Sequence, residues 1–168
     1  AARLLWAKIV QAFGCNAEAQ KMQVHARTAV WNQTTYDPHV NMLRVTTEAF
    51  SAIIGGCDSL HISPFDELAQ SCDEFSRRIA RNTHTLLREE THVTKTVDAA
   101  GGSWYVENLT DAVARQTWGI FQEVERQGGM LKALQAEWPQ AEVAKTAAQR
   151  AANIAKRKDI FVGTNMYP

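Results

Sequence analysis

Six polar side chains gather at or beside two short strand-like runs, residues 23–28 and 59–62, where they could form a binding or catalytic site. They are His25, Arg27, Asp58, His61, Ser63 and Glu67. Imidazole and guanidinium groups donate hydrogen bonds to carbonyl and carboxylate oxygens, whereas carboxylates accept them from hydroxyls. An α/β barrel builds its site from polar groups at the ends of strands that are joined through helices. We therefore expect a polar site where the two strands end.

The first strand is predicted over residues 22–30, because apolar and polar residues alternate there with the period of two that strands show. His25 and Arg27 fall on the polar face. In a barrel the helices cover the apolar face, so these two side chains are expected to point inward. The second strand is predicted over residues 59–62, before a proline breaks it.

A helix is predicted between the two strands, from Pro38 to residue 54. The side chain of Asp37 suits an N-cap, and Pro38 suits the first helical position because its missing N–H needs no partner there. Gly55 and Gly56 follow the last apolar turn and should end the helix.

The remainder of the chain is predicted to be mainly helical. Apolar periodicity and terminal signals predict helices over residues 3–13, 71–90, 110–127, 130–137 and 139–157, irregular chain over 93–105, and a loop or a further strand over 160–163. The helix at 71–90 opens with Ser71 and Glu74 in a capping-box spacing. Its three arginines, Arg77, Arg78 and Arg81, form either a solvated helix face or an ion-binding or interface surface.

The composition is that of a globular protein of ordinary domain size: 168 residues, 45% hydrophobic and 21% charged. Eighteen basic and eighteen acidic residues balance, so the charge predicts neither nucleic-acid binding nor membrane association. No apolar run approaches the roughly 20 residues that span a bilayer, and the first residues lack a signal-peptide layout. Cys15, Cys57 and Cys72 lack zinc-site spacing and suit free thiols. We expect a cytoplasmic protein without a metal site.

Two or three strands cannot close an eight-stranded barrel, which usually takes about 250 residues. The chain is therefore interpreted as one part of a larger α/β domain.

Short motifs along almost the whole chain carry a family resemblance. They include Val24-His25-Ala26-Arg27-Thr28, Asp58-Ser59-Leu60-His61, Phe65-Asp66-Glu67, Arg78-Ile79-Ala80-Arg81-Asn82-Thr83, Gly101-Gly102-Ser103-Trp104-Tyr105 and Gly128-Gly129-Met130. With these motifs in this order, the chain resembles the adenosylcobalamin-dependent acyl-CoA mutases, of which methylmalonyl-CoA mutase is the type.

The resemblance implies a fold. It matches the C-terminal portion of a TIM (β/α)₈ barrel that binds the substrate, followed by a mainly helical segment. Residues 1–168 would form a single partial domain, with barrel strand and helix units over 1–98 and a helical extension of the barrel over 99–168.

The resemblance also implies an isomerase that rearranges the carbon skeleton of a short-chain acyl-CoA by a radical mechanism. The cofactor would be adenosylcobalamin, and its cobalt would be held mainly by a cobalamin-binding domain or subunit that this chain does not contain. The expected partners are the acyl-CoA substrate, that domain and a second subunit in a homodimer or heterodimer. The isolated piece is expected to be inactive.

Each site residue receives a role from this resemblance. His25 would be catalytic by donating a hydrogen bond to the thioester or carboxylate of the substrate; otherwise it is a hydrogen-bonded core histidine. Glu67 would contact the ribose of the deoxyadenosyl group, or else is a first-turn acid favoured by the helix dipole. Ser63 and Arg27 are expected at the cofactor, and His25, Arg27, Asp58 and His61 at the substrate.

Three departures from the family pattern leave the role of the chain open. Arg27 and Asp58 stand where catalytic chains often have glutamine, and Val30 stands where they often have glycine. A buried arginine needs a partner because an unpaired buried charge costs several kcal/mol, so we expect Arg27 to pair with Asp58 or Glu67. Such a pair would favour a non-catalytic small subunit, whereas an open polar lumen would favour a catalytic one. A helical interaction domain is the third interpretation.

Overall fold

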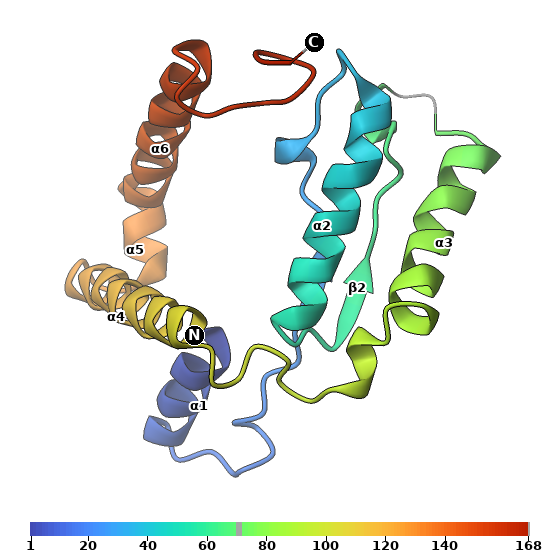
Figure 1. Cartoon of the computed structure of the whole chain (residues 1–168). Coiled ribbons are helices and arrows are strands. Elements are labelled where there is room, and N and C mark those ends of the chain that lie inside the picture. Colours follow the sequence, from blue (N-terminus) through green and yellow to red (C-terminus); the bar gives the residue numbers. More distant parts are fainter. Residues whose placement is uncertain (70–71, 168) are drawn as a thin grey trace. The chain divides into compact units, whose positions relative to one another are not determined.

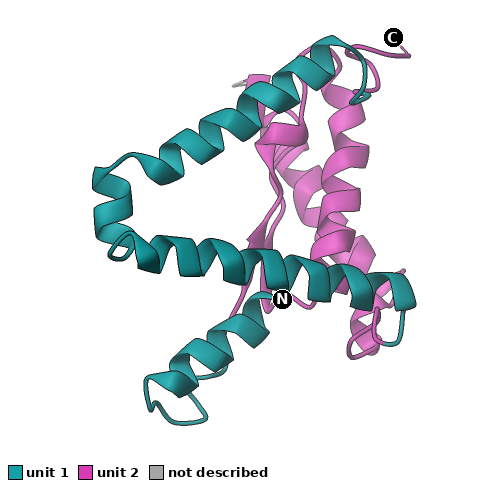
Figure 2. Cartoon of the chain, turned by 90° about the vertical axis from the view of Figure 1, so that its left-hand side faces the viewer, with its two compact units in different colours: residues 1–22, 102–160 teal, residues 23–101, 161–168 magenta. Residues whose placement is uncertain are grey.

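The structure, a computed structural model, describes residues 1–69 and 72–167 and is a helix-rich α/β fold (Figure 1). Within these residues it has six α-helices and one parallel sheet of two strands. The chain forms two compact units: unit 1 comprises residues 1–22 and 102–160, and unit 2 comprises residues 23–101 and 161–168 (Figure 2). The predicted α/β class is confirmed, and the division at residue 98 stays a prediction.

Unit 2 contains the sheet and the two helices that cover it. Its elements are β1 (His25–Arg27), α2 (Asn41–Ile54), β2 (Ser59–His61) and α3 (Glu74–Glu89). The strands pair in parallel, with His25 opposite Ser59, Ala26 opposite Leu60 and Arg27 opposite His61. The predicted first strand over 22–30 was too long, because its partner β2 leads into Pro64, which cannot continue the ladder.

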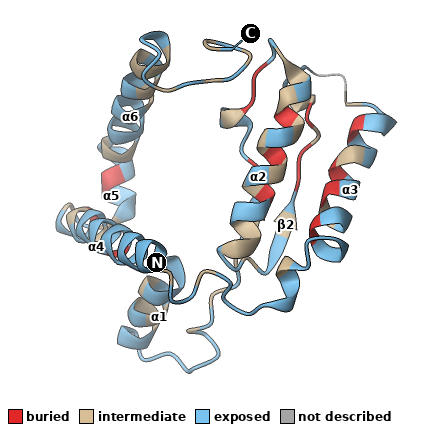
Figure 3. Cartoon of the chain, viewed as in Figure 1, coloured by how far each residue is buried: buried red, intermediate tan, exposed pale blue. Residues whose placement is uncertain are grey.

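The core of unit 2 lies between the apolar face of the sheet and the two helices. Its buried residues are Val45 and Ala49 of α2, Ile62 after β2, and Ala80 and Leu87 of α3, with Ile53 and Leu60 packed against them. Burying one such aliphatic side chain stabilises the fold by about 1.5–3 kcal/mol. Figure 3 shows the buried positions of α2 and α3 on the sides that flank β2. The predicted alternation of the strands is confirmed, since His25, Arg27, Ser59 and His61 are all exposed.

In unit 2 the glycines predicted to end a helix do so, whereas the side chain predicted to cap α2 does not cap it. Gly55 and Gly56 follow α2 as expected, but the Asp37 side chain makes no capping hydrogen bond. Asp37 precedes a short 3₁₀-helix at Pro38–Val40, which separates it from α2. At α3, Asp73 is the N-cap and accepts from the Ser76 N–H at 2.8 Å. Ser71 of the predicted capping box lies outside the described residues.

Unit 1 contains four helices: α1 (Ala2–Ala12), α4 (Trp104–Arg126), α5 (Met130–Gln135) and α6 (Trp138–Ala155). Helix α4 starts six residues before the predicted residue 110, because the Ser103 hydroxyl caps its first turn by accepting from the Val106 N–H. Gly128 and Gly129 take φ angles of 92° and 90°, which glycine adopts without strain. They end α4 as predicted.

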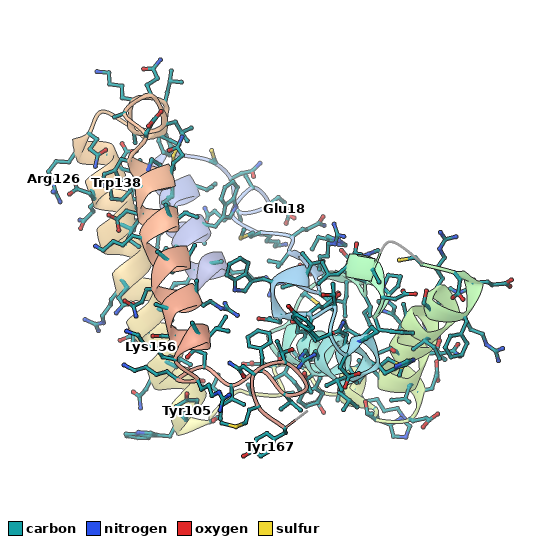
Figure 4. The ribbon with its side chains drawn as sticks, turned by 90° about the horizontal axis from the view of Figure 1, so that it is seen from above. Glu18, Tyr105, Arg126, Trp138, Lys156 and Tyr167 are labelled. Carbon is teal, nitrogen blue, oxygen red and sulfur yellow. The ribbon has the colours of Figure 1, made fainter. Side chains whose placement is uncertain are left out.

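Helices α4 and α6 diverge from the short α5 (Figure 2), and Arg126 and Trp138 mark the ends that α5 joins (Figure 4). No described residue of α1 or α6 is buried. The alternative of a further strand at 160–163 is wrong for the described chain, because Val162 forms only an isolated bridge with Met166.

Candidate functional site

The polar face of the sheet borders a cavity of about 1250 Å³ in unit 2, which we call the sheet cavity. On the sheet side it is lined by the polar residues His25, Arg27, His61 and Glu67 and by the apolar residues Leu60, Ile62 and Pro64. On the helix side it is lined by Cys72, Glu74, Arg77, Ala80, Arg81 and His84. Four of the six predicted site residues therefore line one cavity. Helix α3 adds Arg77 and Arg81, two of the three arginines for which a solvated face and an ion-binding or interface surface were the predicted alternatives.

His25 reaches the sheet cavity because it lies on the polar face of β1. Its Nδ1 is 2.7 Å from the hydroxyl oxygen of Ser59, the residue opposite in the strand register. Apart from Ser59, no described residue forms a hydrogen bond with this imidazole ring, so its Nε2 is available to a ligand in the cavity. The arrangement orients the imidazole and suits it to donate or accept one hydrogen bond.

Arg27 forms an ion pair with Glu67 across the polar face, with Nη2 and Oε1 2.6 Å apart. The predicted pairing is confirmed for Glu67. The expected burial is wrong, since the Arg27 side chain is 57% exposed and that of Glu67 28%. The cause is that the two strands present this face to the sheet cavity rather than to a packed interior. The second carboxylate oxygen, Oε2, is buried and accepts no hydrogen bond from the described residues.

Asp58 lies at the other end of the strand pair. Its Oδ2 accepts from the Val24 N–H at 2.7 Å, and its own N–H donates to the Val24 carbonyl at 2.8 Å. Asp58 directly precedes β2, and the amino ends of two parallel strands lie at the same edge of the sheet. Its carboxylate therefore lies at the amino ends of the strands, opposite to the carboxyl ends that Glu67 follows. The structure does not bring Asp58 to the lining of the sheet cavity, and its role at a substrate stays a prediction.

Ser63 is completely buried beyond the end of β2 and does not line the sheet cavity. Its N–H donates to the Thr28 hydroxyl at 2.9 Å, which holds the two strand ends together. Its own hydroxyl oxygen has no partner among the described residues. The role of Ser63 at a cofactor stays a prediction.

Two residues of α2 position the loops around the site and were not predicted from the sequence. The amide of Asn41 bonds the Thr34 N–H, the Thr34 carbonyl and the Phe65 carbonyl at 2.9–3.1 Å. The carboxylate of Glu48 accepts from the Ala29 N–H and from Asn32 Nδ2, both at 2.7 Å. Local sequence patterns carry no signal for these bonds, because they join residues 7 to 24 positions apart.

The pKa shifts at the site come from burial on the α3 side. Burial lowers the pKa of His84 below its ordinary value of 6.5, and the charge of His61 lowers it further. Burial also raises the pKa of the Cys72 thiol, as does the neighbouring Asp66. His84 therefore tends to be neutral. In the described part of the chain, no three His, Cys, Asp or Glu residues lie together as a metal site would require, and no helix is long and apolar enough to cross a membrane.

Comparison with known proteins identifies the family. The methylmalonyl-CoA mutase family model matches residues 1–168. The chain is 44% identical to the methylmalonyl-CoA mutase small subunit of Porphyromonas gingivalis, covering 100% of this chain and 28% of that protein. It is 41% identical to the large subunit of the same organism and 42% identical to the mutase of Rhizobium meliloti, covering 99% of this chain and 24% of each relative. The chain thus spans about a quarter of these relatives. The resemblance seen in the motifs is confirmed: the chain belongs to the methylmalonyl-CoA mutase family.

Proposed function

We propose that this chain is the C-terminal portion of the substrate barrel in an acyl-CoA mutase, and that it serves there in the supporting role of a small subunit. The rearrangement of a short-chain acyl-CoA would belong to the longer protein and its partner subunit. Family membership supports the mutase, and the parallel β1–β2 pair with its covering helices is compatible with part of a barrel. The ion pair between Arg27 and Glu67 supports the supporting role.

The ion pair matters because Glu67 is the carboxylate that the resemblance assigns to adenosylcobalamin. A two-point contact with the ribose would have each of the two carboxylate oxygens reach one hydroxyl, so both oxygens must be accessible. Here Oε1 is bound to Arg27 and only the buried Oε2 lacks a partner among the described residues. In this arrangement the residues do not fit a two-point contact with the ribose, so we derive no step that uses the cofactor.

A catalytic role is the second candidate, and the position of His25 favours it. The imidazole lines the sheet cavity beside His61 and is oriented by Ser59, with Nε2 left for a ligand. A thioester or carboxylate oxygen placed there would accept one hydrogen bond from this ring. If Arg27 turned away, Glu67 would regain Oε1 as an acceptor for a ligand.

The test is turnover of methylmalonyl-CoA by the complete protein that carries this segment, supplied with adenosylcobalamin. We expect no turnover by this protein alone and turnover after a catalytic partner subunit is added. The variant Arg27→Gln should leave the reconstituted rate unchanged. Its matched control is Arg88→Gln, which removes an exposed arginine paired with Glu89 on α3.

Turnover without a partner, lost in His25→Ala, would overturn the supporting role and establish the catalytic one. Absence of turnover in both preparations would count against methylmalonyl-CoA as the substrate and would direct the test to other acyl-CoA compounds.

A further inference from the structure

Residues 161–167, which we call the strap, belong to unit 2 and dock on the first turns of α2. The strap is folded on itself, since the Phe161 N–H donates to Asn165 Oδ1 at 2.7 Å. Arg44 of α2 holds it by two contacts. Its Nη2 donates to the Val162 carbonyl at 2.6 Å, and its guanidinium carbon lies 5.7 Å from the centre of the Phe161 ring. A cation is attracted to an aromatic face, so one arginine provides both a hydrogen bond and a ring contact to the strap.

The other nitrogen of this guanidinium reaches the buried amide of Asn41. Arg44 Nη1 donates to Asn41 Oδ1 at 2.8 Å, and the same oxygen accepts from the Thr34 N–H at 3.1 Å. Asn41 Nδ2 donates to the carbonyls of Thr34 and Phe65, both at 2.9 Å. The oxygen and nitrogen ends of an amide have nearly the same shape, so a charged donor at the oxygen decides which end faces the carbonyls. Arg44 therefore fixes the orientation of the Asn41 amide.

Phe65 transmits this orientation to the candidate site. Its carbonyl is held by Asn41, and its ring stacks on His39 and meets Phe75 edge to face, with centroids 5.7 and 6.4 Å apart. Phe65 is buried at 7% exposure. Glu67 follows it by two residues, so the position of the Glu67 carboxylate depends on where Phe65 is held.

The strap has a second link to the same loop. The Thr164 hydroxyl donates to the Thr34 hydroxyl at 2.8 Å, and Thr34 is buried. Between these contacts, Gly163 takes a φ angle of 73°, which glycine adopts without strain. A Cβ at this position would lie 3.1 Å from atoms of the Asp37 side chain. The strap therefore fits closely against the segment that leads into α2.

We propose that Arg44 is a positioning residue for Glu67, and that the docked strap holds Arg44 in place. The planar guanidinium can donate in two fixed directions at once, which the single ammonium of lysine cannot do. One direction is used for the strap and the other for Asn41. Release of the strap would free the Asn41 amide and then residues 63–67. The inference rests on the proposed function only in treating Glu67 as the carboxylate of that site.

The test is hydrogen–deuterium exchange of the 168-residue chain, read by mass spectrometry of its peptic peptides. Arg44→Gln should speed exchange roughly fivefold in the peptides that contain Thr34 and residues 63–67, as expected for the loss of about one hydrogen bond. Amides of α3 should keep their rates, whereas a residue that only adds stability would speed exchange throughout the core of unit 2. Arg44→Lys should have a smaller effect, because it keeps the charge. Arg88→Gln, at an exposed arginine of α3, is the matched control.

Gly163→Ala tests the strap without altering Arg44. The added Cβ meets Asp37 and strains the backbone, so the strap should be displaced and the same two peptides should exchange faster. Gly14→Ala is its matched control, because Gly14 has a similar φ of 76° but a Cβ there meets nothing within 4 Å. The double variant Arg44→Gln/Gly163→Ala should exchange no faster in these peptides than the faster of the two single variants.

Unchanged exchange of residues 63–67 in Arg44→Gln, or equally faster exchange throughout unit 2, would overturn the proposal. An effect of Arg44→Gln that Gly163→Ala does not reproduce would overturn the role of the strap. None of these measurements depends on turnover, so their outcome is distinguishable from that of the mutase test.

Discussion

At the scale of single residues, the choice of partner by Arg27 is the most consequential contact in the structure. Two acids were candidates, and the pair forms with Glu67 at the carboxyl ends of the strands. Asp58 is instead engaged by the backbone of Val24 at the amino ends. More than half of the Arg27 side chain is exposed. Water therefore screens the ion pair, and its contribution to the free energy of unfolding is small.

The first prediction follows from that exposure. Arg27→Gln should lower the free energy of unfolding by less than about 1 kcal/mol, as is usual for an ion pair in contact with water. Urea denaturation followed by circular dichroism measures this change, with Arg88→Gln as the control. A loss above roughly 2 kcal/mol would show that the pair behaves as a buried one and that Arg27 has a structural role.

The second prediction concerns His84, whose folded-state pKa lies below its ordinary value because of burial and the nearby His61. The unfolded chain then binds more protons than the folded one as the solution is acidified. The free energy of unfolding should therefore be highest above pH 6.5 and fall as the pH drops through 6.5, until it levels off below the folded pKa.

The measurement compares urea denaturation of the unmodified chain and of His84→Asn from about pH 7.5 to about pH 5.5. The variant should lose stability less steeply over this range. His92→Asn, a change at an exposed position, serves as the control. An identical slope for the unmodified chain and for His84→Asn would contradict the prediction.

At the scale of secondary-structure elements, the first residue of α2 determines how the loops beside the sheet are held. Asn41 is 1% exposed and bonds the backbone of Thr34, before the helix, and of Phe65, after β2. The segment after β2 also carries Glu67, so this one amide fixes the segment from which the site carboxylate extends. A buried polar group is well placed here because all of its hydrogen bonds are satisfied.

The third prediction is that Asn41→Ala lowers the free energy of unfolding by about 2–4 kcal/mol. The change leaves a buried N–H and two buried carbonyls without partners, and each such group costs about 1–3 kcal/mol, partly relieved when water enters. Ser51→Ala is the matched control on the same helix, because the Ser51 hydroxyl bonds only the Thr47 carbonyl of its own helix at an exposed site. A similar small loss in both variants would contradict a central role for Asn41.

At the scale of the whole molecule, the chain leaves much interacting surface uncovered. The two described strands pair only with each other, so each has an edge with unpaired backbone groups. Helix α4 exposes large apolar side chains, among them Trp104 at 85%, Ile120 at 58% and Leu109 at 48%. Such surface on a chain that spans about a quarter of its relatives is expected to be covered by further protein.

The fourth prediction is that the isolated 168-residue chain self-associates. Sedimentation velocity at rising protein concentration should show a growing share of dimers or larger species. Ile120→Lys and Leu109→Lys should reduce this share, because they place charge on the apolar surface of α4. Arg115→Lys, at an exposed position of the same helix that pairs with Asp111, should not. A strictly monomeric chain at all concentrations would contradict the prediction.

The sequence by itself determined where most helices lie, which face of the strands is polar, and the family. Apolar periodicity and the glycines after α2 and α4 were sufficient for these helices because they act between near neighbours. The tertiary structure decided the rest. It selected Glu67 over Asp58 for Arg27, paired β1 with β2 in register, and brought Arg77, Arg81 and His84 to the cavity beside His25. These outcomes depend on the register of the parallel strands and on the packing of α3 across β2. Both join residues that are distant along the chain, so no local pattern could reveal them.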